Sequence, residues 1–176
     1  VLSVGRSVYV KGFDILLYAL KDMSSEIVVY FVWGECTADY KKIIDHLQLQ
    51  NVHFVDNMEY SELKKFYCAA DIFVLPTRSD TWGLVINEAM TYGLPVITTD
   101  QCVAGNALIE NGINGYIVES ENFMQLEYAL QQLINDKKKR DQFGQINYEK
   151  MRDWTFENMG RVMFGHIQKI CENENI

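Results

Sequence analysis

Short apolar runs alternate along the chain with segments in which apolar residues recur every three or four positions. The runs are typical of strands, and the spaced positions are typical of helices that bury one face. The run 27–33 contains seven consecutive apolar residues, which indicates a strand covered on both faces. The pattern predicts strands at 1–4, 27–33, 52–55, 71–75, 95–99 and 115–118, with helices between them at 12–23, 38–47, 61–70, 82–92 and 107–111.

Strands and helices that alternate with short connections indicate βαβ units and a parallel sheet. We therefore expect an α/β fold, a doubly wound Rossmann-like parallel sheet of about six strands. Only helices are predicted after the last strand, at 121–135, 137–152 and 156–171. The last carries an apolar stripe, which either packs on the core or is exposed in part and favours self-association. The stripe consists of Phe156, Met159, Val162, Met163, Ile167 and Ile170.

Composition and charge narrow the class of protein. The chain has 176 residues, 48% of them hydrophobic and 23% charged, which is the profile of one soluble globular domain. The formal net charge of -8 argues against a nucleic-acid binder with a broad basic face. A small anionic ligand needs only two or three cations and remains compatible with this charge. The longest apolar run is far shorter than the ~20 residues that span a bilayer, and no signal peptide precedes it.

The cysteines lie far apart, with no C-x-x-C pair and no metal-ligand spacing to the three histidines. We expect free, buried thiols in a reducing compartment, the cytoplasm. The four are Cys36, Cys68, Cys102 and Cys171. The chain opens without a methionine, directly in the strand-like Val-Leu-Ser-Val, so we expect it to be a piece of a longer protein.

Ligands of a doubly wound sheet bind beyond the carboxyl ends of the strands, where the strand order reverses. With the order 3-2-1-4-5-6, the segments 5–12 and 76–88 should meet there. In the first segment, Gly5 permits close approach of a ligand, and the cations Arg6 and Lys11 either bind a diphosphate or are solvated surface.

The second segment, 76–88, combines two carboxylates with an unusual glycine. Asp80 is, together with Thr81, a candidate N-cap for the helix that follows. Gly83 is unusual in a first helical turn and suits a backbone that touches a ligand. Glu88 lies on a largely apolar helix, either at its exposed edge or in a cleft where it accepts ligand hydroxyls. Two cations facing two carboxylates fit a ligand that is anionic at one end and rich in hydroxyls at the other.

Six motifs in order resemble the C-terminal, donor-binding domain of the retaining family 4 (group 1) glycosyltransferases, which have the GT-B fold of two Rossmann-like domains. They are Val4-Gly5-Arg6 with Lys11-Gly12-Phe13, Asn51-Val52-His53-Phe54, Ala69 to Pro76, Gly83-Leu84 with Asn87-Glu88-Ala89-Met90 and Gly93-Leu94-Pro95-Val96, Asn111 to Val118, and Trp154 to Asn158. The resemblance covers residues 1 to about 170.

The resemblance implies a nucleotide diphosphate sugar as the donor and assigns a role to each matching residue. Arg6 and Lys11 would bind the diphosphate and stabilise the leaving nucleotide. Glu88 would accept the ribose hydroxyls, and Asp80 would lie near the sugar. The other donor-binding positions are Gly5 in the first loop, Gly34, Val55 and Met58 around the base, and the backbone of Trp82, Gly83 and Leu84 at the sugar hydroxyls.

The resemblance also implies what lies outside the domain. A saccharide or lipid-linked acceptor would bind the N-terminal domain, absent from residues 1–176, and the domain alone would turn over poorly or not at all. The parent enzyme would act in polysaccharide biosynthesis, in the cytoplasm or at the inner face of the membrane. No Asp-x-Asp pair occurs, so we expect no cofactor and no catalytic metal, with Arg6 and Lys11 neutralising the diphosphate instead.

Three departures from the family pattern bear on sugar selectivity. Asp80 stands where a glutamate is usual, Gly34-Glu35-Cys36 replaces a commoner loop at the base, and the loop 101–107 lacks the usual double glycine and glutamate. Asp80 and this loop support one alternative, a non-catalytic nucleotide-sugar binding module. A GT-B nucleotide-sugar epimerase shares the fold and is a third reading.

Overall fold

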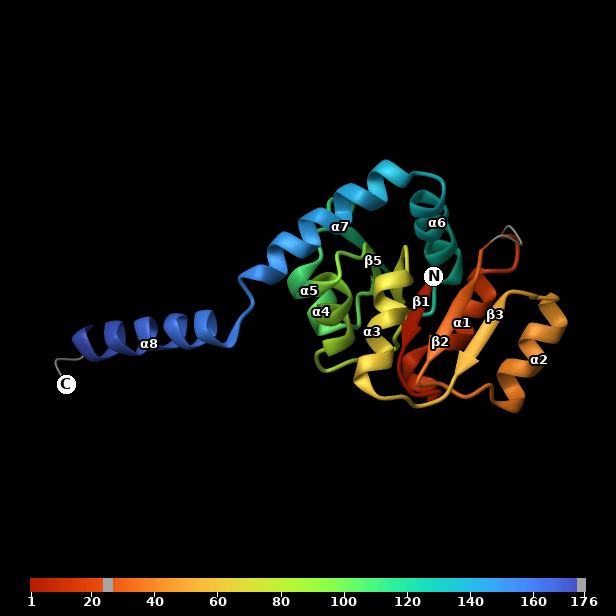
Figure 1. Cartoon of the computed structure of the whole chain (residues 1–176), viewed down its shortest axis with the longest axis horizontal. Helices are drawn as coiled ribbons and strands as arrows, with labels where there is room; N and C mark the ends of the chain where they lie inside the picture. Colours follow the sequence, from red (N-terminus) through yellow and green to blue (C-terminus); the bar gives the residue numbers. More distant parts are fainter. Residues whose placement is uncertain (24–26, 174–176) are drawn as a thin grey trace.

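The computed structural model describes residues 1–23 and 27–173, and the side chains of these residues except 156, 172 and 173. All six strands pair in parallel in the order β3-β2-β1-β4-β5-β6. They are β1 Leu2–Val4, β2 Val29–Val32, β3 Val52–Val55, β4 Phe73–Leu75, β5 Val96–Thr99 and β6 Gly115–Val118. This order confirms the predicted doubly wound α/β sheet (Figure 1).

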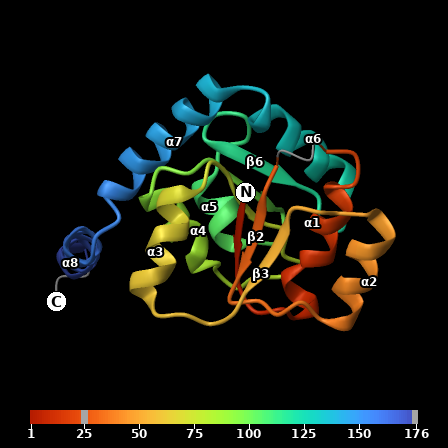
Figure 2. The ribbon, with the colours of Figure 1, turned by 45° about the vertical axis from the view of Figure 1, so that its right-hand side comes forward.

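Helices cover both faces of the sheet (Figure 2). Those of the described chain are η1 Tyr9–Lys11, α1 Phe13–Ala19, α2 Ala38–Leu47, α3 Tyr60–Ala69, α4 Leu84–Thr91, α5 Val103–Leu108, α6 Phe123–Ile134, α7 Lys137–Arg152 and α8 Phe156–Asn173. One core lies between the sheet and α1, α2 and α6, and a second between the sheet and α3, α4 and α5. Helix α7 contributes Phe143 to the first core and Met151 to the second.

Several predicted element boundaries differ from the structure. Helix α1 ends at Ala19 instead of residue 23, and β2 begins at Val29 instead of residue 27. Strand β2 is also less covered than predicted, because Tyr30 is 36% exposed. The helical turn predicted at 107–111 is the helix α5 at 103–108, and the turn η1 was not predicted.

The four cysteines are free, as predicted, but only Cys102 is buried. The prediction of buried thiols is wrong for Cys36, Cys68 and Cys171, which are exposed. Cys36 lies in the loop before α2, and Cys68 lies on the solvent side of α3. Their apolar character therefore did not decide their position.

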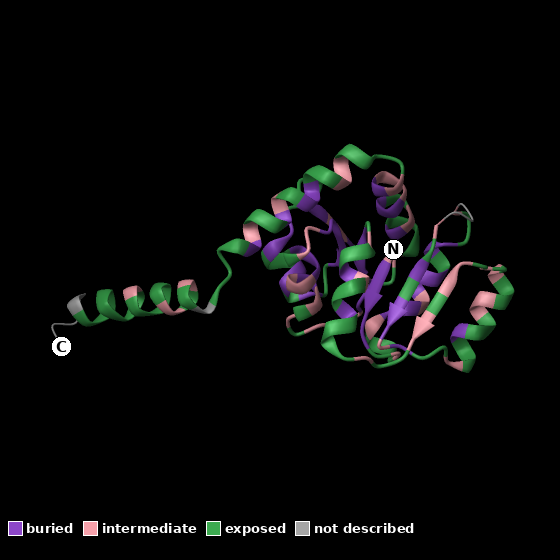
Figure 3. Cartoon of the chain, viewed as in Figure 1, coloured by how far each residue is buried: buried purple, intermediate pink, exposed green. Residues whose placement is uncertain are grey.

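Helix α8 lies apart from the sheet and its covering helices (Figure 1). Its apolar stripe is more than half exposed at every described position, so it does not pack on this domain's core (Figure 3). Those positions are Met159, Val162, Met163, Ile167 and Ile170, with Phe164 beside them. Within 1–23 and 27–173, none of the helices has the length and apolar character that a membrane span requires.

Candidate functional site

The loops that follow β1 and β4 meet at the carboxyl edge of the sheet. The two strands are paired neighbours, and Lys11 Nζ lies 2.6 Å from Asp80 Oδ2. The two residues are 69 apart in the sequence, and their side chains are only 22% and 14% exposed. The structure therefore brings a predicted cation and a predicted carboxylate into one ion pair, where water screens their charges less than at an open surface.

Backbone contacts hold the Lys11 turn against the β4 loop. The Val10 carbonyl accepts hydrogen bonds from Thr77 Oγ1 at 2.8 Å and from the Arg78 N–H at 2.7 Å. Gly12 has a φ of 67°, and a Cβ there would lie 2.0 Å from the Pro76 carbonyl oxygen. Only glycine fits this close approach, so the sequence Lys11-Gly12 has a structural reason besides any ligand.

Arg78 is a residue at this edge that the sequence analysis did not single out. Its guanidinium makes a bidentate pair with Asp14 at 2.9 and 2.6 Å, bonds both carboxylate oxygens of Glu121 and donates to the Tyr9 carbonyl at 2.6 Å. The bonds to Asp14 raise the pKa of Arg78 above its ordinary value. All five guanidinium N–H groups are therefore engaged within the protein. Arg78 joins three segments and has no donor left for a ligand.

The loop that leads into α4 is fixed by its own side chains. Gly83 is the N-cap residue, with a φ of 94°, and a Cβ there would lie 2.7 Å from Cys102 Sγ. The expectation that Asp80 or Thr81 caps α4 is wrong, since Asp80 Oδ1 accepts from the Trp82 N–H at 3.3 Å, before the helix begins. Close packing on Cys102 accounts for the glycine without requiring a ligand.

The departing loop 101–107 packs directly on this segment. The Asp80 N–H donates to the Gln101 carbonyl at 3.0 Å, and the Ala104 N–H donates to the Trp82 carbonyl at 2.7 Å. The Trp82 indole donates to Asn87 Oδ1 at 2.9 Å. The loop 101–107 thus starts α5 and fixes the backbone on which Asp80 and Trp82 lie.

Glu88 is half-buried on α4, and its carboxylate is held from a neighbouring helix. The hydroxyl of Tyr67, a fully buried residue of α3, donates to Glu88 Oε2 at 2.7 Å. Neither of the two expectations for Glu88 anticipated this bond. In the sequence, Tyr67 is one more aromatic residue on the buried face of a helix, so no pattern indicates its polar contact.

The segments predicted around a base lie at the ends of β2 and β3. The Trp33 indole donates to the Met58 carbonyl at 3.3 Å, and Trp33 itself has a φ of 64°. Ser7 Oγ donates to the Glu35 carbonyl at 2.7 Å, which joins this loop to the one that carries Arg6. Gly34 is buried between them, while Val55 and Met58 are half-buried.

Arg6 and Leu84 differ from their neighbours in exposure. The Arg6 side chain is exposed and forms no ion pair within the described part of the chain. Leu84, the first residue of α4, is 68% exposed. No group of three or more His, Cys, Asp or Glu that could hold a metal ion occurs among residues 1–23 and 27–173.

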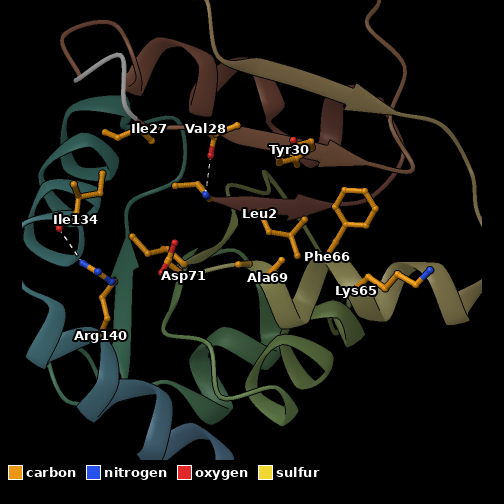
Figure 4. A pocket seen from close by; sticks show the side chains of 13 residues that line it. Leu2, Ile27, Val28, Tyr30, Lys65, Phe66, Ala69, Asp71, Ile134 and Arg140 are labelled. Carbon is orange, nitrogen blue, oxygen red and sulfur yellow. Dashed lines mark hydrogen bonds between the residues drawn. The ribbon is translucent and has the colours of Figure 1, made fainter.

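A hollow of about 600 Å³ lies at the opposite edge of the sheet, by the amino ends of the strands (Figure 4). Apolar side chains such as Leu2, Ile27 and Phe66 line it. Arg140 at its rim donates to the carbonyls of Leu133 and Ile134, at 2.7 and 2.8 Å. Neither the doubly wound topology nor the charge of its lining indicates a phosphate-bearing ligand here.

Comparison with protein families decides the class of this domain. The family model of the glycosyl transferases group 1 matches residues 1–150 of the 176. The chain belongs to this family. The spore coat protein SA of Bacillus subtilis (strain 168) is 32% identical to the glycosyl transferase domain over 161 residues, which are 84% of the chain and 42% of that protein. The domain spans less than half the length of the curated relatives it matches.

Solved structures carry the same fold. The C-terminal domain of the group 1 glycosyl transferase LpcC from Francisella tularensis matches with a TM-score of 0.76 and 24% identity, over 84% of this glycosyl transferase domain and 82% of that chain. S. aureus TarM in complex with fondaparinux, alpha-GlcNAc-glycerol and UDP matches with a TM-score of 0.81 and 20% identity, over 92% of this domain and 34% of that chain. The domain therefore has the architecture of a GT-B C-terminal half.

Proposed function

We propose that this glycosyl transferase domain binds a nucleotide diphosphate sugar at the carboxyl ends of β1 and β4 and supports retaining transfer of the glycosyl group to an acceptor hydroxyl. The pairing of Lys11 with Asp80 is the observation that carries the proposal. It joins the family's cationic segment to its carboxylate segment where doubly wound sheets bind ligands.

The diphosphate binds Arg6 and Lys11 in this proposal. Arg6 is exposed and free of ion pairs within the described chain, so it can meet the phosphates without losing a partner. Lys11 is half-buried, and charge-assisted hydrogen bonds from such a group to a phosphate are strong. Both cations stabilise the negative charge that the nucleotide acquires as it leaves, with no metal ion required.

The remaining parts of the donor follow the carboxyl edge. Glu88 accepts the ribose hydroxyls, and Asp80 with the backbone at Trp82, Gly83 and Leu84 addresses the sugar. The base lies beside Gly34 and the segment 55–58, because this segment and the diphosphate loop are joined through the Ser7–Glu35 hydrogen bond.

We assign the acceptor, a saccharide or a lipid-linked saccharide, to a domain outside residues 1–176. The domain spans 42% of the spore coat protein SA, which leaves room for a second domain in proteins of that length. Residues 1–176 alone are then expected to bind donor without turnover. Transfer by this domain at a rate usual for enzymes would contradict the assignment.

Metal-free calorimetric titration with UDP-, GDP- and ADP-sugars tests the proposal, with Glu88→Ala as the site variant. Glu62→Ala is the matched control, because Glu62 lies on the exposed face of α3 and bonds only Lys65. UDP-sugars come first, since TarM was solved with UDP. We expect saturable binding of one nucleotide that Glu88→Ala removes and Glu62→Ala keeps. A folded domain that binds none of the three, or that binds equally well as Glu88→Ala, would contradict the proposal.

A further inference from the structure

One hydrogen bond links the candidate site to the core beneath it. Tyr67 is fully buried, and its hydroxyl lies 2.7 Å from Glu88 Oε2. Glu88 Oε1 makes no hydrogen bond within the described residues. The two oxygens of this carboxylate are therefore unequal, since only one is held by the protein.

Packing fixes the place of the Tyr67 hydroxyl. The ring stacks on Tyr92 with a centroid distance of 5.3 Å and an interplanar angle of 4°, and it packs at 6.0 Å against the Phe73 ring of β4. A ring held on two sides has little rotational freedom, so its hydroxyl is a stationary donor. Burial and the neighbouring Glu88 carboxylate raise the pKa of Tyr67 above its ordinary value of 10.0, which keeps the phenol protonated.

We propose that Tyr67 is a positioning residue, which holds Glu88 Oε2 so that Oε1 is aimed at the ribose hydroxyls of the donor. This inference rests on the role of Glu88 in the proposed function. A carboxylate with one anchored oxygen loses less side-chain freedom when it binds a diol, so the anchor improves affinity without touching the ligand.

The alternative is that Tyr67 only stabilises the core, and nucleotide analogues separate the two roles. Tyr67→Phe removes one oxygen atom and keeps both ring contacts. If the hydroxyl acts through Glu88 on the ribose, Tyr67→Phe weakens UDP but leaves 2′,3′-dideoxyuridine diphosphate unaffected. A role confined to the core changes the binding of both nucleotides alike or of neither.

The experiment is a calorimetric titration of UDP and the dideoxy analogue into the wild type, Tyr67→Phe, Glu88→Gln and the double variant. Tyr92→Phe is the matched control, because it removes a hydroxyl from the stacked partner that does not bond Glu88 in the structure. We expect Tyr67→Phe to weaken UDP about three- to tenfold, Glu88→Gln at least tenfold, and the double variant no more than Glu88→Gln.

The outcomes distinguish this inference from the function on which it rests. If Glu88→Gln binds UDP as the wild type does, the ribose role of Glu88 fails. If Glu88→Gln weakens UDP and Tyr67→Phe does not, or weakens both nucleotides equally, the positioning role alone is overturned. Glu88→Asp serves where Tyr67→Phe fails to fold, since the shorter carboxylate must choose between phenol and ribose. It should reproduce the selective loss of UDP, and equal affinity for UDP in Glu88→Asp would overturn the inference.

Discussion

Lys11 Nζ and Asp80 Oδ2 lie 2.6 Å apart, although one residue follows β1 and the other follows β4. Both were predicted to contact the donor, and in the structure they contact each other. A diphosphate that binds Lys11 therefore competes with Asp80 for the same ammonium group. The two residues should then affect nucleotide affinity in opposite directions.

Lys11→Met should weaken UDP binding by about tenfold or more, because a charge-assisted hydrogen bond contributes roughly 1.5–3 kcal/mol. Asp80→Asn removes the competing charge and should bind UDP at least as tightly as the wild type does. Lys41→Met is the control, since Lys41 pairs with Asp45 at the exposed surface of α2. Calorimetry measures all three affinities. Equal weakening by Lys11→Met and Asp80→Asn would show that the intact pair, and not the free ammonium, makes the site.

Gly12→Ala should destabilise the domain by about 3 kcal/mol or more, because its Cβ meets a backbone oxygen as well as an unfavourable φ. Gly112→Ala is the matched control, with a φ of 79° and no atom within 4 Å of the added Cβ. That variant should lose only about 1 kcal/mol. Urea unfolding monitored by circular dichroism gives both values. Similar losses in the two variants would mean that the turn at Gly12 moves away from Pro76 at little cost.

Arg78→Met should lower the free energy of unfolding by about 2–3 kcal/mol, since it leaves the Asp14 and Glu121 carboxylates without their shared partner. The estimate lies below that for a fully buried pair because Glu121 is 55% exposed. Arg78→Lys should recover only part of the loss, because an ammonium cannot make the bidentate contact. Lys137→Met, which breaks the exposed pair with Asp141, should cost about 0.5 kcal/mol or less. A full recovery in Arg78→Lys would remove the bidentate geometry from the explanation.

Alkylation should divide the four thiols into three fast and one slow. Cys36, Cys68 and Cys171 are exposed, whereas burial of Cys102 raises its pKa above the ordinary value of 9.0. The thiolate is the reactive form, so Cys102 labelling should accelerate only as the pH rises above this value. Mass spectrometry after iodoacetamide treatment at pH 8 should show three adducts first. A fourth adduct formed equally fast in the folded domain would contradict the burial of Cys102.

Much of the fold was predictable, because periodicity reports which residues face a core. The strands 52–55 and 115–118 and the helices 38–47 and 137–152 lie where the pattern predicted them. The errors fall where tertiary contacts decide the boundary. Helix α5 begins at Val103 because the Asp80 and Trp82 carbonyls accept its first N–H groups, and periodicity contains no record of that contact. The stripe on α8 was visible in the sequence, but its exposure was not.

The candidate site was predictable in its location but not in its internal contacts. Topology and the family motifs brought Lys11 and Asp80 to one edge of the sheet. The bonds that hold the site come from Arg78 and Tyr67, whose surroundings in the sequence are those of a surface loop and a buried helix face. Such partners lie 64 and 21 residues away along the chain, so only the folded structure shows them.

The central claim is that the nucleotide binds at the carboxyl ends of β1 and β4, and amide chemical shifts test it residue by residue. A ¹⁵N-labelled domain of 20.4 kDa is suited to this measurement. On titration with UDP, we predict shift changes at Gly5, Lys11 and Gly83, with none at Leu2 and Phe66 beside the hollow at the opposite edge. Changes confined to that hollow, or none anywhere at millimolar UDP, would contradict the account.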